Sequence, residues 1–351
     1  MAEKVIRIAV DAMGGDNVPD VLVEGSLEAL VVYPDINITL VGDENTVGIS
    51  LNRLINSEKY GKSGTSWKES DKHRISIVHA EDVIEMCDSP ARAIRSKKRA
   101  SIVVANKLCR TGEADAVISA GNTGAAMAAS LLYMGRLTGV SRPAITALFP
   151  STKNVVAIID VGANTDCKPE HLYQFAVMAS IYTSHVLGYQ HPRVGLLSIG
   201  EERTKGNELT NNAYDLLENS ELNFIGNVEG RDIFNGAADV VICDGFVGNV
   251  LLKFGESIFG FITHSIRKSL TKSIWRKMGA YLLKPVFMEI KAEVSPEDYG
   301  GAPLLGVDGI SIICHGNSTS YAITNAIRVA RQLVFERINE QIKHELAKKS
   351  L

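Results

Sequence analysis

Short apolar runs in this chain repeatedly end in loops of Gly, Asn and Asp, residue types that bind anions and position protons. The five loops are residues 11–16, 119–124, 160–164, 198–207 and 244–249. Glycine lets bare backbone approach a ligand, and the start of a following helix offers free N–H groups to an anion. No residue pattern in them indicates a redox cofactor or a metal. We therefore expect an oxyanion ligand and no cofactor.

The strongest anion pattern lies at residues 119–125, which follow an apolar run and open a helical pattern. Backbone N–H groups at such a helix start face an anion. The alternative is a tight turn between strand and helix that needs glycine only for packing. The predicted phosphate-binding residues of this loop and of the first loop are Gly121, Asn122, Thr123, Gly124, Gly14, Gly15 and Asp16.

Several polar side chains in the other loops suit acyl or phosphoryl chemistry. Lys205 stands beside a glycine, where an ammonium group can reach a phosphate as a point charge. Asparagine can donate to a developing oxyanion, and a carboxylate or an imidazole can hold a proton. The candidates are Lys205, Asn164, Asn249, Asp244 and His315. The alternatives are a solvated loop for the lysine and local backbone caps for the aspartate and histidine.

The elements that must position these loops follow an alternating strand and helix pattern from residue 5 to about residue 242. The apolar runs are continuous, which is typical of parallel strands buried on both faces. Such strands bring their carboxyl ends to one edge of the sheet, where ligands bind. The pattern predicts strands at residues 6–10, 36–41, 75–79, 116–118, 155–159, 194–197 and 240–242, and helices at 21–32, 91–109, 124–133, 170–187 and 209–217.

Composition sets limits on the function. The chain has 351 residues, 45% of them hydrophobic, and a net charge of −3, which gives no support to nucleic-acid binding. Its five cysteines form no CxxC pair, and its start does not read as a signal peptide, so a reducing cytosol is expected. GxGxxG, GxxxxGK[ST], HExxH and GxSxG are all absent. The uncharged residues 116–135 are expected to form a strand, a loop and a buried helix instead of a membrane span.

Residues 254–291 differ from the rest of the chain. Their apolar positions follow a helical period, then rotate around the helix axis past residue 270, so a turn near residues 269–273 and two helices are predicted. Basic residues occupy the opposite side. Such a pair can lie on an anionic membrane or line an acyl chain, and the alternative is a subunit interface or packing on the chain's own core. The predicted contact residues are Ile262, Ile266, Trp275, Met278 and Leu282.

The predicted organisation is a main α/β body at residues 1–253, the helical pair at 254–291, and a return to the body with a C-terminal helical region at 292–351. Residues 56–74 are polar and indicate a surface excursion. Basic residues crowd residues 92–99, where a solvated helix face is the default and an acidic protein partner the alternative. The docking residues predicted for such a partner are Arg95, Lys97, Lys98 and Arg99.

Six sequence blocks together resemble the phosphate acyltransferases of bacterial phospholipid synthesis, the PlsX family. They run in family order over nearly the whole chain, and each is weak by itself. The blocks are IAVDAMGGD at 8–16, ISAGNTGA at 118–125, DVGAN at 160–164, FIGNVE at 224–229, DGFVGN at 244–249 and YGGAPLLG at 299–306.

This resemblance implies a three-layer α/β/α fold similar to the isocitrate and isopropylmalate dehydrogenases and to phosphotransacetylases. It implies a homodimer that transfers a long acyl chain from acyl carrier protein to inorganic phosphate. The acyl phosphate would then feed a membrane glycerol-3-phosphate acyltransferase, so the protein would be cytoplasmic and peripherally membrane-associated. In that reaction Asp244 or His315 would handle the proton of the departing thiol. The rival hypotheses are a metal- and NAD-dependent hydroxyacid dehydrogenase and a non-catalytic docking module.

Overall fold

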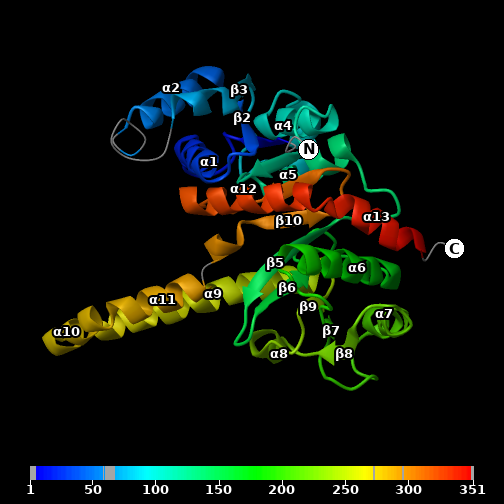
Figure 1. The fold of residues 1–351 in the computed structure, drawn as a ribbon. Helices are drawn as coiled ribbons and strands as arrows, with labels where there is room; N and C mark the ends of the chain where they lie inside the picture. The colour runs from blue at the N-terminus through cyan, green and yellow to red at the C-terminus, as the bar shows by residue number, and fades with distance from the viewer. Residues whose placement is uncertain (1–4, 58, 60–67, 272, 295, 349–351) are drawn as a thin grey trace. The chain divides into compact units, whose positions relative to one another are not determined.

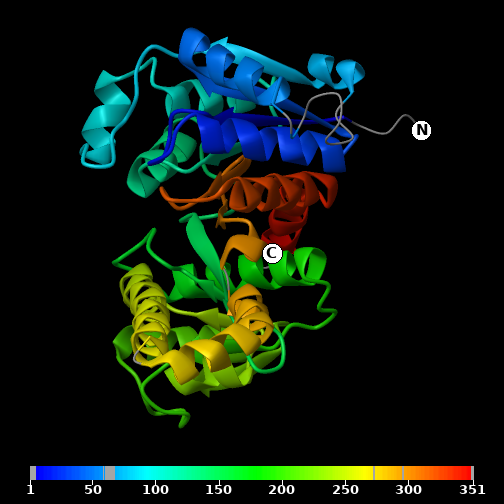
Figure 2. The ribbon, with the colours of Figure 1, turned by 90° about the vertical axis from the view of Figure 1, so that its left-hand side faces the viewer.

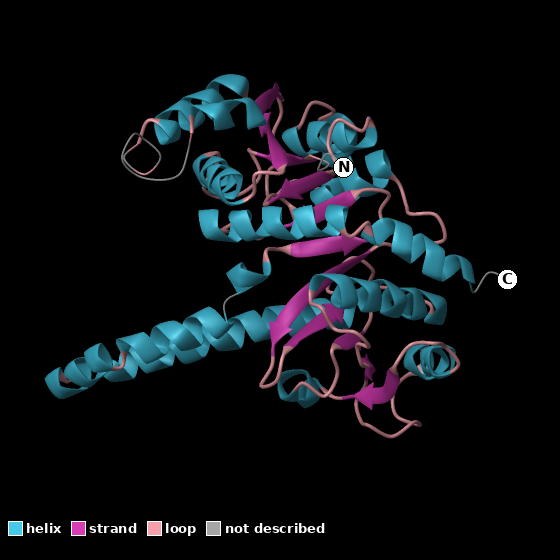
Figure 3. Cartoon of the chain, viewed as in Figure 1, coloured by secondary structure: helices cyan, strands magenta, loops and turns pink. Residues whose placement is uncertain are grey.

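The computed structural model describes residues 5–57, 59, 68–271, 273–294 and 296–348, in which helices and strands alternate (Figures 1 and 3). The chain forms two compact units. Unit 1 comprises Met1–Thr146, Val177–Pro192 and Glu297–Leu351, and unit 2 comprises Ala147–Ala176 and Arg193–Pro296. The predicted boundary between residues 253 and 254 falls inside a single helix of unit 2.

Unit 1 contains a mixed sheet with the strand order β3-β2-β1-β4-β11-β10-β5. The strands from β3 to β11 are parallel, and β10 is antiparallel to both of its neighbours. The strands are β1 (Ile6–Asp11), β2 (Ile36–Gly42), β3 (Ile75–His79), β4 (Ala116–Ser119), β5 (Ala144–Pro150), β10 (Ala302–Leu305) and β11 (Ile310–Ile313). β5 starts in unit 1 and ends in unit 2.

The helices of unit 1 pack in two groups, one containing α1, α2 and α12 and the other α3, α4 and α5. They are α1 (Asp20–Val32), α2 (Glu44–Ile55), α3 (Pro90–Ser96), α4 (Ser101–Arg110), α5 (Thr123–Ala129), α12 (Ser320–Phe335) and α13 (Ile338–Lys348), with a π-helical turn at Ser130–Met134 and 3-10 helices at Glu69–Arg74 and Pro296–Tyr299. Figure 2 shows α1 and α12 next to each other in a second view.

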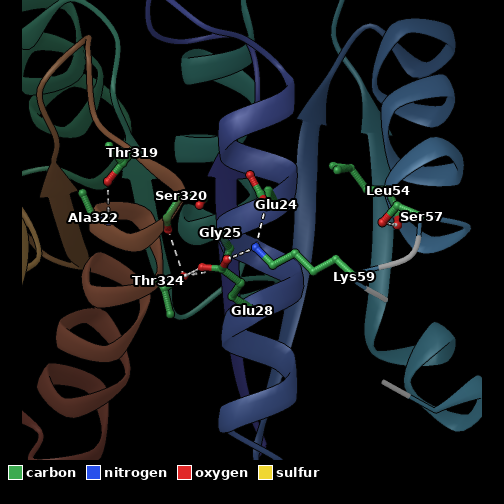
Figure 4. Close-up of polar contacts among 10 residues, drawn as sticks. All are labelled: Glu24, Gly25, Glu28, Leu54, Ser57, Lys59, Thr319, Ser320, Ala322 and Thr324. Carbon is green, nitrogen blue, oxygen red and sulfur yellow. Dashed lines mark hydrogen bonds and ion pairs between the residues drawn. The ribbon is translucent and has the colours of Figure 1, made fainter. Parts of the chain in front are cut away.

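Close backbone approach fixes α1 against α12. A methyl group at Gly25 would lie 2.6 Å from the Ser320 carbonyl oxygen, so only glycine fits there. The Thr324 hydroxyl donates to carbonyl groups of both helices or to the Glu28 carboxylate, at 2.9–3.1 Å (Figure 4). Lys59 pairs with Glu24 and Glu28 at 2.7 and 2.6 Å. α12 therefore holds the C-terminal segment on the N-terminal strands.

Unit 2 has a parallel sheet with the order β6-β9-β7-β8. Its strands are β6 (Val155–Ile159), β7 (Val194–Leu197), β8 (Phe224–Val228) and β9 (Val240–Ile242). Its helices are α7 (Glu208–Glu218), α8 (Gly230–Asn235), α9 (Gly245–Leu270), α10 (Ile274–Leu282) and α11 (Lys284–Val294), and α6 (Pro169–Val186) begins here and ends in unit 1.

Most of the predicted elements are present. The strands at 75–79, 155–159, 194–197 and 240–242 match to the residue, and the apolar runs of β1, β4, β6 and β9 are buried. Residues 116–135 form β4, a loop and α5 with its π-helical turn, as predicted. Residues 58 and 60–67 of the predicted excursion lie outside the described residues.

The predicted single helix at residues 91–109 is wrong, because the backbone leaves the helix between α3 and α4. Lys97 has φ −95° and ψ 69°, and Ala100 is extended. The Lys97 ammonium bonds the Val83 carbonyl at 2.8 Å and the Asp88 carboxylate at 2.6 Å. These tertiary contacts hold the break, and a helical period in the sequence cannot reveal them.

The predicted turn near residues 269–273 is confirmed. α9 ends at Leu270 and α10 starts at Ile274, with Ser273 accepting from the Arg276 N–H as the cap. α10 follows the C-terminal end of α9, and α11 then runs back in the direction opposite to α9 (Figure 1). Among the described helices, α9 alone is long and apolar enough to cross a membrane by length and composition. Its first residues pack on β6 within unit 2, so they belong to the body of that unit.

Candidate functional site

Two glycine loops of unit 1 meet over a buried carboxylate. β1 and β4 are parallel neighbours that pair Asp11 with Ser119, so the loops that follow them are adjacent. A methyl group at Gly14 would lie 2.6 Å from Asp11 Oδ2 and 2.9 Å from the Gly121 nitrogen. Ser119 Oγ donates to Asp11 Oδ2 at 2.7 Å and accepts from the Gly121 N–H at 3.2 Å. The two loops thus form one layer of backbone above Asp11.

The start of α5 offers backbone amides while the side chain of Asn122 is occupied. Asn122 Oδ1 accepts from the Ala125 N–H at 3.0 Å, which caps the helix. Its Nδ2 is 3.0–3.4 Å from the carbonyl oxygens of residues 85, 86 and 88. The N–H groups of Thr123 and Gly124 have no acceptor among the residues that the structure describes. The loop therefore presents an anion with its backbone, and Asn122 contributes by capping.

The end of β11 brings a third loop to the same place, because β11 is the parallel neighbour of β4. The Asp16 N–H donates to the Gly316 carbonyl at 2.8 Å. Gly15 has φ +135°, and a methyl group there would lie 3.2 Å from that carbonyl oxygen. His315 is exposed, and its Nδ1 lies 2.6 Å from Asn317 Oδ1. His315 thus belongs to the unit 1 group of predicted residues.

In unit 2 a second buried carboxylate organises the loop after β6. Asp160 is fully buried. Its Oδ1 accepts from the N–H groups of Gly162 and Ala163 at 3.1 and 2.9 Å. Its Oδ2 accepts from the backbone N–H and the Nδ2 of Asn164 at 2.7 and 2.9 Å. One of the two N–H bonds of the predicted oxyanion donor Asn164 is therefore used to orient its side chain.

The start of α9 is pressed against this loop. A methyl group at Gly248 would lie 1.9 Å from the Asp160 carbonyl oxygen, and one at Gly245 would lie 2.7 Å from the Asn164 carbonyl oxygen. Asp244 caps α9 by accepting from the Val247 N–H at 2.9 Å. Asn249 is exposed, and its side chain lies beside Gly162, 3.6 Å from where a methyl group would stand. Unit 2 thus gathers Asn164, Asp244 and Asn249 around Asp160.

Lys205 lies on the loop between β7 and α7, and its side chain is exposed. A methyl group at Gly200 would stand 2.9 Å from Lys205 Cγ, so the aliphatic stem packs over that glycine. Arg203 holds the loop by pairing with Asp215 and by stacking 4.2 Å from the Tyr214 ring centroid. Among the described residues no hydrogen bond or ion pair joins Lys205 to the Asp160 group.

The model of the fatty acid synthesis protein family matches residues 6–341. This chain belongs to that family. It is 49% identical over 341 residues to the phosphate acyltransferase of Pelotomaculum thermopropionicum, covering 97% of this chain and 95% of that protein. It is 47% identical over 345 residues to the phosphate acyltransferase of Halothermothrix orenii, covering 98% and 99%. The family predicted from the sequence blocks is confirmed.

Solved structures of other proteins share the fold. A phosphotransacetylase from Streptococcus pyogenes superposes with a TM-score of 0.61 at 14% identity, covering 94% of each chain. A 4-hydroxythreonine-4-phosphate dehydrogenase from Klebsiella pneumoniae gives 0.51 at 15% identity, covering 95% of this chain and 98% of that one. The predicted α/β fold with helices on both sides of the sheet, similar to dehydrogenases and phosphotransacetylases, is confirmed.

In this member of the fatty acid synthesis protein family, some basic side chains of residues 92–99 form ion pairs within the chain and others do not. Lys97 is paired with Asp88, and Arg99 is paired with Glu81. Arg95 and Lys98 are exposed and form no ion pair among the described residues. α3, which carries Arg95, packs on the glycine loop, since a methyl group at Gly124 would lie 2.7 Å from Pro90 Cγ.

The predicted membrane or acyl-chain residues are exposed apolar side chains of α9 and α10. The exposed fractions are 48% for Ile262, 40% for Ile266, 75% for Trp275, 54% for Met278 and 76% for Leu282. Several exposed apolar side chains on two consecutive helices are typical of an interaction surface.

Sequence reasoning missed the two buried carboxylates that organise the loops. Asp11 and Asp160 each end an apolar strand and precede a glycine, and this shared position was the available signal. What the sequence does not reveal is their burial. Burial raises the pKa of the Asp11 carboxyl above its ordinary value, against hydrogen bonds from the hydroxyls of Ser101 and Ser119 and from the backbone.

Proposed function

We propose that this protein transfers a fatty acyl group from acyl carrier protein to inorganic phosphate, giving an acyl phosphate. The observation that carries the proposal is membership of the family over residues 6–341, whose curated relatives bear the name phosphate acyltransferase. A phosphate oxygen attacks the thioester carbonyl carbon, the carbon–sulfur bond breaks, and the thiolate takes a proton. Phosphate is ionised near neutral pH, so the protein must mainly position it and stabilise the tetrahedral oxyanion.

The test uses the purified chain with acyl-loaded carrier protein and no other protein. Release of free carrier should require phosphate and should be matched by formation of acyl phosphate. Equal release without phosphate, or none with it, would refute the proposal. The same assay separates it from a non-catalytic docking module, which would bind the carrier without turnover. Stabilisation by a nicotinamide nucleotide in a thermal shift assay would instead favour a dehydrogenase.

The phosphate is assigned to the glycine loops of unit 1. Their support is the pair of N–H groups at Thr123 and Gly124 that lack an acceptor among the described residues. Backbone amides at a helix start bind anions without a side-chain charge. Gly14, Gly15, Asp16 and Gly121 would supply the backbone surface beside them. Thr123→Pro removes one of these N–H groups at a helix position that tolerates proline. It should raise the KM for phosphate more than the KM for the acyl carrier.

Lys205 is proposed to bind phosphate as a point charge, Asn164 or Asn249 to donate to the oxyanion, and Asp244 or His315 to manage the thiol proton. One lost oxyanion donor costs roughly 3–4 kcal/mol of transition-state stabilisation, so Asn164→Ala or Asn249→Ala should lower kcat by more than a hundredfold. Lys205→Ala should lower turnover at least tenfold. Lys253→Ala is the control, because that exposed lysine pairs locally with Glu256 at 2.9 Å. Near-normal turnover of Lys205→Ala would remove it from the site.

The acyl carrier protein is proposed to dock on α3, whose exposed Arg95 is free of intramolecular ion pairs among the described residues. A positive patch attracts an acidic partner mainly by speeding association. Arg95→Glu should raise the KM for the acyl carrier several-fold with little change in the KM for phosphate. Arg99→Glu provides the comparison, since Arg99 is already paired with Glu81. Equal effects of the two substitutions would contradict docking through α3.

The exposed apolar side chains of α9 and α10 are proposed to rest on an anionic membrane surface, which would make the protein peripheral and cytoplasmic. Trp275→Glu with Leu282→Glu should release it from anionic vesicles. Leu132→Glu is the control, because Leu132 is 59% exposed in unit 1. The alternative occupant is a second copy of the chain in a homodimer. Dissociation of a dimer by the double substitution, without a change in vesicle binding, would favour that alternative.

Delivery of the acyl phosphate to a membrane glycerol-3-phosphate acyltransferase belongs to the same proposal. An acyl phosphate is an activated and amphipathic product, so an acceptor reaction at a membrane suits its chemistry. Co-sedimentation with vesicles that carry that acyltransferase should exceed binding to protein-free vesicles. Equal binding to the two kinds of vesicle would indicate that this protein contacts the lipid and not the acyltransferase.

A further inference from the structure

Asp11 is a buried ionisable group to which the reaction described above gives no role. Its side chain is 2% exposed at the end of β1. Oδ2 accepts the Ser119 hydroxyl at 2.7 Å and Oδ1 accepts the Met13 N–H at 3.4 Å, and the Ser101 hydroxyl and the Gly14 N–H also bond the carboxyl. Each of these hydrogen bonds favours the charged form of the carboxyl, whereas its burial favours the neutral form.

The carboxyl lies directly beneath the two glycine loops assigned to phosphate. A methyl group added at Gly14 would lie 2.6 Å from Asp11 Oδ2, and one added at Gly121 would lie 3.7 Å from the same oxygen. One layer of glycine backbone thus separates the carboxyl from an anion on these loops. A bound anion and the Asp11 carboxylate would repel each other across this layer, where little water screens them. This repulsion favours uptake of a proton by the carboxyl.

Among the described residues that line the cavity next to the carboxyl, none carries a positive charge that would relieve this repulsion. Asp11 lines a small cavity of about 10 Å³, room for about one water molecule. Of the described residues that line the cavity, Asp11 alone is ionisable. The other charged or titratable side chains on the segments that line the cavity, and on the loop after β11, do not themselves line it; they are Arg7, Asp16, Glu81, Asp82, Glu85, Cys87, Asp88, Lys107, Cys109, Arg110 and His315.

We propose that the Asp11 carboxyl takes up one proton from solvent when an oxyanion binds the loops at residues 14–16 and 121–124. Oδ2 keeps its bond from Ser119, which in turn accepts from the Gly121 N–H. Protonation removes the one negative charge beneath the bound anion and leaves the loop geometry unchanged. Asp11 is thus a positioning residue whose charge state follows occupancy of the site. The inference rests on the phosphate site proposed above.

The raised pKa of the Asp11 carboxyl fits this assignment, because burial already favours its neutral form. The hydroxyls of Ser101 and Ser119 lower that pKa and keep the charged form accessible in the empty protein. Loss of one such hydroxyl should therefore move proton uptake to higher pH.

Calorimetric titration with sulfate tests the proposal, since sulfate has the shape of phosphate and does not itself titrate near neutral pH. Binding heats are measured in buffers of different ionisation enthalpy across about pH 5–9, which gives the number of protons taken up. The wild type should take up as much as one proton per sulfate within this range. Asp11→Asn should bind sulfate without uptake, and Glu113→Gln, which changes an exposed carboxylate outside these loops, should keep the uptake.

Ser119→Ala gives a second reading if Asp11→Asn fails to fold. It keeps the carboxyl and removes one hydrogen bond, so the pH of maximal uptake should rise. Sulfate binding without uptake at any pH, or the same uptake by Asp11→Asn, overturns the inference and leaves the phosphate site standing. Absence of both sulfate and phosphate binding overturns the site and the inference with it.

Discussion

A glycine series along α9 tests how tightly the candidate site is built. A methyl group at Gly248 would lie 1.9 Å from the Asp160 carbonyl oxygen, one at Gly255 would lie 3.2 Å from Phe149 Cε1, and one at Gly260 would meet no atom within 4 Å. All three glycines lie within α9, so alanine at each makes the same change in helix propensity. The series therefore separates packing from propensity.

The expected magnitudes follow from these distances. In an open helical position, alanine is favoured over glycine by about 0.5–1 kcal/mol, so Gly260→Ala should stabilise by that amount. At Gly248 the methyl group needs about 1.5 Å more space, and overpacking of this kind costs about 1–3 kcal/mol or more. The two variants should differ by roughly 2–4 kcal/mol, and Gly255→Ala should lie between them.

Thermal unfolding measures the series. For a chain of 351 residues, a difference of this size corresponds to a separation in Tm of about 3–5 °C. Gly248→Ala should also lose turnover, because its methyl group displaces the loop that carries Asn164. Equal Tm values for Gly248→Ala and Gly260→Ala would refute the close packing of α9 on Asp160. A stable but inactive Gly248→Ala would place the displacement in the loop alone.

Three further predictions follow from named contacts. Asp160→Ala leaves four donors without their acceptor and should lower the unfolding free energy by about 3–5 kcal/mol in urea titrations; a loss below about 1 kcal/mol would contradict its organising role. The Asp11 pKa is raised in the folded state, so the stability tied to its proton is complete below the unfolded pKa and is lost as pH rises through the folded pKa; the Tm of wild type should fall relative to Asp11→Asn over that rise, and parallel curves would contradict this. Thr324→Val removes the hydroxyl that links α12 to Gly25 and Glu28 of α1 and should cost about 1 kcal/mol in the same titrations, where an unchanged midpoint would deny the link.

The fold is largely local in origin. The runs that became β4, β6 and β9 are continuous in Val, Ile and Ala, β1 interrupts such a run only at Arg7, and a strand of this kind is stable only when both faces are covered. The break between α9 and α10 was readable because the apolar side of the helix shifts past Leu270. The single helix predicted over residues 91–109 failed because its break depends on contacts of Lys97 with Val83 and Asp88.

The candidate site residues also show which properties follow from local sequence and which depend on tertiary contacts. Asn122 has a residue type that suits an anion contact, yet its side chain caps α5 and bonds the chain before α3. Lys97 and Arg99 carry the charges expected of a docking surface, yet both are paired within the chain. Residue type predicts what a side chain is able to do, whereas its partners decide what it does.

The sequence by itself determined the family, many of the strands and helices, and the loops in which chemistry is to be sought, because these depend on hydrophobic period and on short motifs. The tertiary structure alone decided that Asp11 and Asp160 are buried beneath those loops. Burial and hydrogen-bond partners come from residues far apart in the chain, as Asp11 and Ser119 show, and no local pattern encodes them.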